Sequence, residues 1–411
     1  MTPSLIIALA AAAVILILAL TSPWLSPLLP TGTITGTGTP NKDENGNANA
    51  NNPSSLIPHL SSSINPISLI IVPGHSSMAL RTLVGSLLKQ DYPSPFQVIV
   101  VTEKGDTDTA DAIAPFTDDE RLYVTHVPES SRYVSRRKLA VTLGVKAAAH
   151  ERIILTDATC QIEGDQWLRN IARHLHPDTQ LTIFNANEST DGNEKLKPED
   201  QKPLSAFQRF RHHFITCSII SSSPWRTLSH MIAFRKSLFL DSQGYRDNLQ
   251  FAAGEYDFLV SLFAHRENTV VLPPTSSAIV AEPLSPRQRR NNQLQYLSIR
   301  NHLRHARTAR WRFNSYATAM YLSDLAIIAG LAAPLYLPQP ECWLTCAVAA
   351  IAAIAGYALR VYIAHRSATR LATHINAALA PIFERWQPIH QLLWLIRYWR
   401  SDKTDYTTHK V

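Results

Sequence analysis

The chain has 411 residues, of which 45% are hydrophobic and 17% are charged, and its formal net charge is +7. This length can bury a large core, and this hydrophobic content excludes a largely disordered chain. With 14 glycines and 4 cysteines, the chain is neither collagen-like nor a small disulfide-rich scaffold. Its basic residues cluster beside apolar segments and no nucleic-acid-binding motif is present, so we expect no nucleic-acid partner.

The N-terminal region predicts a membrane anchor followed by a linker. Residues 5–20 are an unbroken apolar run that, with its flanking residues, is long enough to cross a bilayer. A cleaved signal peptide is the alternative, but its first segment should be basic, and the first lysine here is Lys42. We therefore expect a transmembrane anchor at 1–25. Residues 26–65 are rich in Thr, Gly, Asn, Ser and Pro, which is typical of a flexible linker.

The next part of the chain alternates between segments typical of strands and of helices. The predicted strands are rich in β-branched residues and almost continuously apolar, at 67–72, 97–101, 122–127 and 152–156. Helix-like segments lie between them at 78–90 and 135–149. This order predicts an α/β fold with an open, doubly wound, mostly parallel sheet.

Acidic residues follow two of these strands. Ligands of such sheets bind beyond the carboxyl ends of the strands, where Glu103 and Asp157 are expected. No GxGxxG motif follows the first strand and no GxxxxGK[ST] motif occurs, which argues against a dinucleotide site and a P-loop. Carboxylates at a nucleotide-binding edge favour a metal-bridged diphosphate, or recognition of ribose and base.

The C-terminal region predicts a transmembrane hairpin at 313–364. Two apolar runs, 316–337 and 342–363, are joined by the short link PQPE. Arginines lie on both outer sides of the hairpin, so the positive-inside rule places both flanks in the cytoplasm. Three spans then give a multi-pass inner-membrane protein whose middle domain, 66–312, faces the cytoplasm.

Two features of this region leave alternatives open. Asp324 lies inside the first apolar run, where it could be functional or interfacial. The segment 381–400 mixes Trp, Leu and Arg, and it could form an interfacial amphipathic helix or pack back on the soluble domain. It belongs to a predicted cytoplasmic or interfacial tail at 365–411.

Three stretches resemble one family. The first predicted helix ends in QDYP at 90–93. Residues 135–160 combine a lysine, small residues and a strand that ends at Asp157, and residues 254–257 (GEYD) stand at a predicted helix start. Together they resemble the family-two glycosyltransferases with a GT-A fold, in a membrane-anchored bacterial form, over roughly residues 67–300.

This resemblance implies an inverting glycosyltransferase of cell-envelope polysaccharide biosynthesis. The donor is a nucleotide sugar, and the acceptor is membrane-associated: a glycolipid, a lipid-linked sugar or a growing glycan. A divalent cation (Mg²⁺ or Mn²⁺) is implied as cofactor, with Asp157 as its ligand. The catalytic base is Glu255 or Asp257, which the sequence does not separate. The implied donor-binding residues are Glu103, Lys138, Asp157, Arg289 and Arg290.

Two positions depart from the family pattern. Thr159 and Tyr256 stand where the family has acidic residues. We therefore expect a weakened dependence on the cation. The alternative function is a degenerate glycosyltransferase scaffold that binds a nucleotide sugar or a partner without catalysis.

Overall fold

The computed structural model describes most of the chain, apart from the N-terminal region and several loops. The described residues are 9, 12–14, 17, 65–73, 77–128, 135–188, 205–221, 224–265, 267–281, 284–335, 338 and 341–402. The chain divides into two compact units. We call residues 32–190 and 227–283 the sheet unit, and residues 1–31, 191–226 and 284–411 the helical unit. The predicted anchor and linker lie almost wholly outside the described residues.

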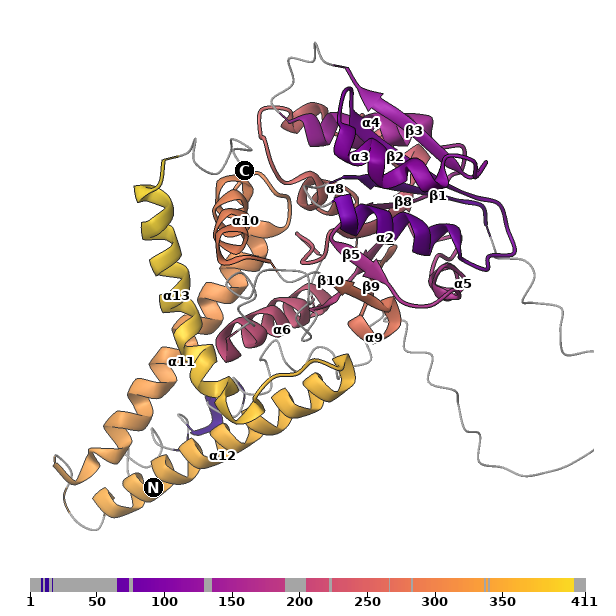
Figure 1. Cartoon of the computed structure of the whole chain (residues 1–411). Helices are drawn as coiled ribbons and strands as arrows, with labels where there is room; N and C mark the ends of the chain where they lie inside the picture. Colours follow the sequence, from indigo (N-terminus) through magenta and orange to yellow (C-terminus); the bar gives the residue numbers. More distant parts are fainter. Residues whose placement is uncertain are drawn as a thin grey trace, which may run out of the picture. The chain divides into compact units, whose positions relative to one another are not determined.

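The sheet unit is built on a seven-stranded, mostly parallel sheet with the order β3-β2-β1-β4-β8-β6-β9 (Figure 1). Four strands pair in parallel, as predicted, and occupy the first half of the sheet: β1 (Ile67–Val72), β2 (Phe96–Glu103), β3 (Leu122–Val127) and β4 (Arg152–Asp157). The predicted α/β class is therefore confirmed. The other half contains β8 (Met231–Arg235), which is antiparallel to both β4 and β6 (Leu181–Phe184), and β9 (Thr269–Leu272), which is parallel to β6.

Helices cover the sheet, and a second, smaller sheet lies in the same unit. The helices and 3-10 turns are α2 (Ser77–Leu88), α3 (Thr107–Ile113), η2 (Ala114–Phe116), α4 (Arg136–Ala147), α5 (Trp167–Ala172), α7 (Lys236–Asp241), η3 (Arg246–Asn248), α8 (Glu255–Phe263) and α9 (Pro274–Ser277). The small sheet has the order β5-β10-β7, formed by Cys160–Ile162, Ile279–Ala281 and Asn187–Glu188.

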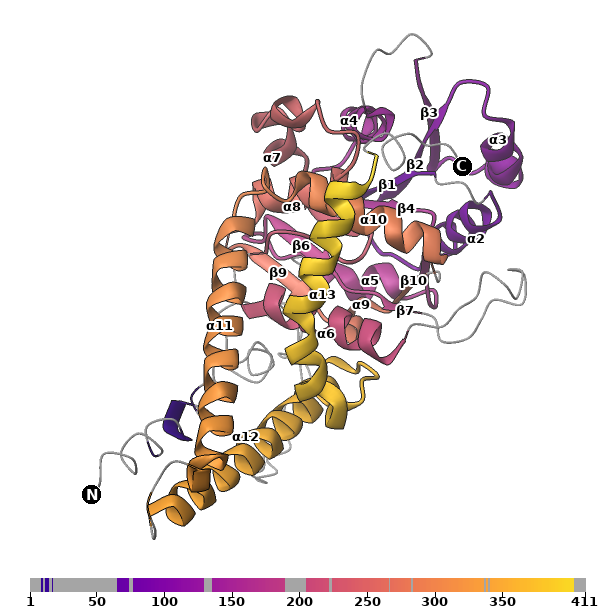
Figure 2. The same cartoon turned by 90° about the vertical axis from the view of Figure 1, so that its left-hand side faces the viewer.

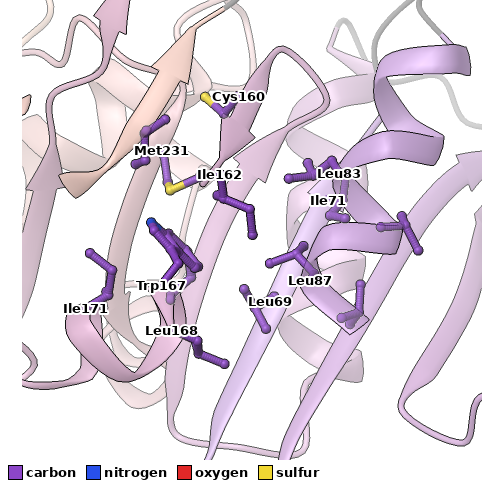
Figure 3. Close-up of a cluster of buried hydrophobic side chains, with 14 of the residues drawn as sticks. Leu69, Ile71, Leu83, Leu87, Cys160, Ile162, Trp167, Leu168, Ile171 and Met231 are labelled. Atoms are coloured by element: carbon purple, nitrogen blue, oxygen red, sulfur yellow. The ribbon is translucent and has the colours of Figure 1, made fainter. Parts of the chain in front are cut away.

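The core of the sheet unit follows from alternation along β1. Leu69 and Ile71 lie in a buried cluster with Leu83 and Leu87 of α2 (Figure 3). Ile70, between them, faces the other side of the sheet, where α4 packs. Because successive side chains of a strand point to opposite faces, a strand covered on both sides is apolar at most positions. This explains why β1, apart from the buried Ser68, reads as the apolar run that predicted it.

Gly144 allows α4 to approach the sheet closely. A Cβ at this position would lie 2.6 Å from Ile70 Cγ2 and 3.1 Å from Val101 Cγ2. In an open helix position, Gly→Ala stabilises by up to about 1 kcal/mol. Here we expect Gly144→Ala to destabilise the chain by about 1–3 kcal/mol, because the core must shift. Thermal unfolding of the purified chain measures this, with exposed Lys146→Ala in the same helix as control. A variant as stable as wild type would contradict the close packing.

The helical unit consists of long helices from the second half of the chain. They are α6 (Ala206–Ser221), α10 (Pro286–Ile299), α11 (Ala306–Leu331), α12 (Glu341–Leu371) and α13 (Ala380–Arg400), with short 3-10 turns at Ala333–Leu335 and Ala377–Leu379. α11 and α12 pack against each other as a hairpin (Figures 1 and 2). At their contact, a Cβ on Gly330 would lie 2.7 Å from Ala349 Cβ.

The prediction of three membrane spans is only partly supported. Among the described residues, one helical segment, Cys342–Leu371, is long and apolar enough to cross a membrane. The predicted span 316–337 is wrong as a single helix, because α11 ends at Leu331. Pro334 lies just beyond this end and cannot continue the helical hydrogen bonding. The first predicted span, 5–20, falls almost entirely on residues that the structure does not describe.

Polar contacts join α13 to the hairpin. Arg385 Nε and Nη2 donate to the two carboxylate oxygens of Asp324, at 2.8 and 2.7 Å. Tyr316 donates its hydroxyl to Glu384 at 2.7 Å, and Arg360 Nε lies 3.5 Å from the same carboxylate. Asp324 therefore has a structural ion-pair partner, which neither of the two alternatives for this residue had anticipated. The segment 381–400 likewise packs within its own unit, against α11 and α12.

Candidate functional site

Asp157 is the centre of a polar cluster at the carboxyl end of β4. Its side chain is only 4% exposed. Oδ1 accepts the backbone N–H of Thr159 at 3.0 Å as well as the Thr159 hydroxyl. Oδ2 lies 2.6 Å from His230 Nδ1 and 3.6 Å from Arg137 Nη2. Burial alone would raise the pKa of Asp157, but His230, Arg137 and Thr159 together lower it to about 2.

Arg137 connects Asp157 to the start of α8. Its Nε donates to Glu255 Oε1 at 2.6 Å. Arg137 stands in the first turn of α4, after the N-cap Ser135, whereas Glu255 is the first residue of α8. Burial would raise the pKa of Glu255, but Arg137 lowers it below its usual value. Two carboxylates from different stretches of the sequence, both predicted as site residues, are therefore brought into one cluster.

His230 and Tyr256 complete this cluster. His230 precedes β8, and its backbone carbonyl accepts the N–H of Asp157 at 3.3 Å because β8 is the antiparallel neighbour of β4. The ring of Tyr256 stacks on that of His230, with centroids 5.4 Å apart and an interplanar angle of 12°. Tyr256 is 5% exposed, and its buried hydroxyl has no hydrogen-bond partner among the described residues.

Asp257 is held differently from Glu255. Its Oδ1 accepts the backbone N–H of Thr227 at 3.0 Å. Both residues lie in the first turn of α8, after Gly254, whose φ of 88° favours glycine. Glu255 is thus linked to Asp157 through Arg137, while one oxygen of Asp257 fixes the segment that leads to β8. The two candidates for the base, Glu255 and Asp257, therefore have different hydrogen-bond partners.

Glu103 lies at the carboxyl end of β2, as expected. Its side chain is 55% exposed and pairs with Arg136 of α4. The preceding residue, Thr102, donates its hydroxyl to Asp106 at 3.0 Å, and Asp106 caps the N-terminus of α3. Glu103 and Asp157 are therefore both at the carboxyl edge of the parallel strands, and adjacent arginines of α4 pair with each of them.

Lys138 is placed inside the sheet unit. Its side chain is fully buried, and Nζ donates to the backbone carbonyls of Asn248 and Phe251, both at 2.7 Å. Nζ also lies 4.5 Å from the centroid of the Phe258 ring. Burial lowers the pKa of Lys138 to about 8. The predicted donor contact stays a prediction, whereas the observed contacts hold the segment that precedes α8.

Arg289 and Arg290 belong to α10 in the helical unit. Ser285 and Gln288 form a capping box at the start of this helix, which is why it begins at Pro286. The two arginines follow in its first turns. Their predicted role with the leaving diphosphate stays a prediction.

The residues around Asp157 do not fit a resident divalent cation. Both oxygens of this carboxylate are already engaged, and two of their partners are the cationic or proton-donating side chains of Arg137 and His230. Among the described residues, no group of three or more His, Cys, Asp or Glu side chains could hold a metal ion. Hard cations need several oxygen ligands, whereas Arg137 and His230 offer nitrogen donors already bound to the carboxylate.

Sequence reasoning missed Arg137 and His230. Arg137 directly precedes the lysine that the motif singled out, but nothing in the sequence shows which of three consecutive basic residues turns toward Asp157. His230 directly precedes β8, but its contact with Asp157 depends on the pairing of β8 with β4. An antiparallel neighbour for β4, had it been predicted, would have placed His230 beside the end of that strand.

Comparisons with known proteins match the middle of the chain to one family. Residues 65–265 match the family described as "Glycosyltransferase like family 2". A solved structure of the mannosyltransferase PcManGT from Pyrobaculum calidifontis, in complex with GDP-Man and Mn²⁺, is 15% identical and aligns over 94% of this chain and 99% of that chain, with a TM-score of 0.45. S. aureus TarS 1-349 is 15% identical over 79% of this chain and 92% of that chain, with a TM-score of 0.38. A comparison with curated proteins found no match.

Proposed function

Because residues 65–265 form a glycosyltransferase family 2 domain, we propose that this chain transfers a sugar from a nucleotide-sugar donor to a membrane-associated acceptor, with inversion at the anomeric carbon. The chain is accordingly a glycosyltransferase. The predicted resemblance to the family-two glycosyltransferases is confirmed by the match of residues 65–265. The donor, the acceptor and the stereochemistry are parts of the proposal.

The observation that carries the proposal is the link from Asp157 through Arg137 to Glu255. It joins the end of β4, where a donor diphosphate is expected, to the start of α8, where a base is expected. Inversion requires the base and the diphosphate site to lie on one connected surface, because the acceptor oxygen attacks opposite the leaving group.

Glu255 is proposed as the base. The acceptor hydroxyl attacks the anomeric carbon, and its proton passes to the Glu255 carboxylate. The bond from the anomeric carbon to the diphosphate oxygen breaks, and its electron pair leaves with the diphosphate. Asp257 is the less suitable base, because its hydrogen bond to the Thr227 N–H holds the segment before β8, whereas Glu255 is linked through Arg137 to Asp157.

The nucleoside is proposed to bind near Glu103. This carboxylate lies at the carboxyl edge of the sheet and is more than half exposed, so it can accept hydrogen bonds from a ribose or a base. Arg136 orients it. Arg289 and Arg290 remain proposed contacts of the leaving diphosphate, where basic side chains would stabilise the developing charge.

The acceptor is proposed to be membrane-associated because the helical unit has an apolar surface. Exposed side chains include Leu322 and Ile328 of α11, Ile351 and Ile354 of α12, and Leu392 of α13. The span Cys342–Leu371 supports a membrane location. A multi-pass inner-membrane topology with a cytoplasmic catalytic domain is the arrangement we propose.

The test is a donor panel on the full chain purified in detergent. UDP-, GDP- and dTDP-sugars are compared by thermal shift and by release of the nucleoside diphosphate. One donor class is expected to raise the melting temperature and to be slowly hydrolysed. Stabilisation without turnover, even with lipid-linked acceptors, would favour the degenerate scaffold. Absence of any donor effect would contradict the proposal.

A further inference from the structure

The place expected to hold a metal is filled by side chains of the protein itself. Arg137 and His230 lie against one oxygen of Asp157, and Thr159 donates to the other. Thr159 stands where the family pattern has a second acidic residue, so this chain lacks the carboxylate that would compete with Arg137 and His230. A divalent ion entering here would have to displace both.

We propose that Arg137 and His230 bind the donor diphosphate directly, in the place of a divalent cation, so that donor binding and transfer are independent of metal. This inference rests on the proposed function and concerns how its donor is held. Asp157 becomes a positioning residue, which orients the two nitrogen donors. Arg137 and His230 become the residues that touch the substrate.

Both side chains are accessible to a ligand despite their anchoring. The side chain of His230 is 38% exposed and that of Arg137 is 25% exposed, whereas Asp157 behind them is 4% exposed. Because the pKa of Asp157 is about 2, its carboxylate is ionised and can only accept hydrogen bonds. His230 Nδ1 therefore donates to Asp157, and the other ring nitrogen, Nε2, is left to contact a ligand. Arg137 uses Nε for Glu255 and Nη2 for Asp157, and its Nη1 has no recorded partner among the described residues.

The charges support direct binding. Arg137 lies between the carboxylates of Asp157 and Glu255, so its charge is compensated while its position is fixed. Guanidinium groups match phosphate oxygens with two parallel hydrogen bonds, which makes an anchored arginine a suitable phosphate ligand. When the bond to the sugar breaks, its electron pair and the new negative charge pass to the diphosphate oxygen beside these donors. The proton released by the acceptor goes to Glu255.

Tyr256 gives the second, independent observation. It replaces an acidic residue of the family pattern, stacks on His230, and has a buried hydroxyl that lacks a hydrogen-bond partner in the described part of the chain. Leaving a buried hydroxyl unpaired is unfavourable, so this hydroxyl marks a place where a ligand oxygen can be received. The aromatic ring also fixes the plane of the imidazole. Both departures from the family pattern, Thr159 and Tyr256, therefore serve the same arrangement.

The experiment measures binding of UDP and GDP to the full chain in detergent by calorimetry, with a chelator and with Mn²⁺ or Mg²⁺. We expect the preferred nucleotide to bind with closely similar affinity in the chelator and with either cation. Arg137→Gln and His230→Gln should each weaken this binding by about 10- to 100-fold, the loss typical of one charge-assisted contact. Arg173→Gln and His176→Gln replace exposed residues of the same unit and should leave binding unchanged.

The outcomes separate this inference from the proposed function. Binding and turnover that appear only with a cation would overturn the metal-independent site while leaving the glycosyltransferase proposal intact. Absence of nucleotide binding in every condition would overturn both. If Arg137→Gln fails to fold, the wild-type comparison between chelator and cation decides alone. Equal affinity in both conditions, with His230→Gln no weaker than His176→Gln, would also overturn the role given to His230.

Discussion

Glu255→Gln is expected to lower turnover by about 100- to 10,000-fold, the range typical for loss of a general base. A glutamine keeps an oxygen that can accept the hydrogen bond from Arg137 Nε, which now lies 2.6 Å from Glu255. It cannot take a proton from the acceptor. Donor binding should therefore change little, while transfer of the sugar is lost. Single-turnover transfer and nucleotide binding, measured on the same preparation, separate the two effects.

Asp257→Asn is the matched comparison for Glu255→Gln. An asparagine oxygen can still accept the Thr227 N–H, so this variant should fold and should retain most of the transfer activity. Burial would raise the pKa of Glu255, but Arg137 lowers it below its usual value, so the base should stay ionised under more acidic conditions than an ordinary glutamate. Loss of transfer in Asp257→Asn with retention in Glu255→Gln would reverse the assignment.

Lys138→Met is expected to destabilise the chain by about 2–6 kcal/mol. Methionine fills a similar volume but leaves the carbonyls of Asn248 and Phe251 unpaired in a buried place, at about 1–3 kcal/mol for each. The segment 248–254 leads directly to Glu255, so its loosening should also reduce transfer. Chemical unfolding of the full chain measures the stability, and a single-turnover assay measures the transfer.

The pH dependence of stability gives an independent check on Lys138. Its pKa is about 8 in the folded chain against 10.5 ordinarily, so the unfolded chain holds this proton more tightly. Stability contributed by this group should therefore rise as the pH increases from about 8 to 10.5. Lys138→Met should lack this rise. Lys146→Met, at an exposed position of the same helix, should keep both the stability and the rise. Equal stability of the two variants would contradict the role of Lys138.

Much of the sheet unit could be predicted because most segments that read as apolar strands in the sequence are buried in the structure. β1 and β4 are buried along their whole length and mostly apolar, and their ends placed Asp157 correctly at the edge of the sheet. Glu255 was found because a glycine and acidic residues at a helix start form a recognisable local pattern. These features are set by neighbours in the sequence, so a single sequence contains them.

The remaining features depend on contacts between distant segments. Lys138 looked like a donor ligand, but the carbonyls that bind it lie more than a hundred residues later. His230 was invisible as a site residue because its position depends on the antiparallel pairing of β8. The contact of Arg385 with Asp324 depends on how α13 packs on α11. No pattern within one segment identifies such partners, since each partner is supplied by the fold.

The polar pairs between α13 and the hairpin have a consequence for how the chain matures. Asp324 and Arg360 are synthesised before Arg385 and Glu384, the residues that pair with them. Until α13 is synthesised, Asp324 and Arg360 lack these partners. A nascent chain interrupted after residue 379 would therefore lack the ion-pair partners of both Asp324 and Arg360. These polar contacts of the helical unit can therefore form only after α13 has been synthesised.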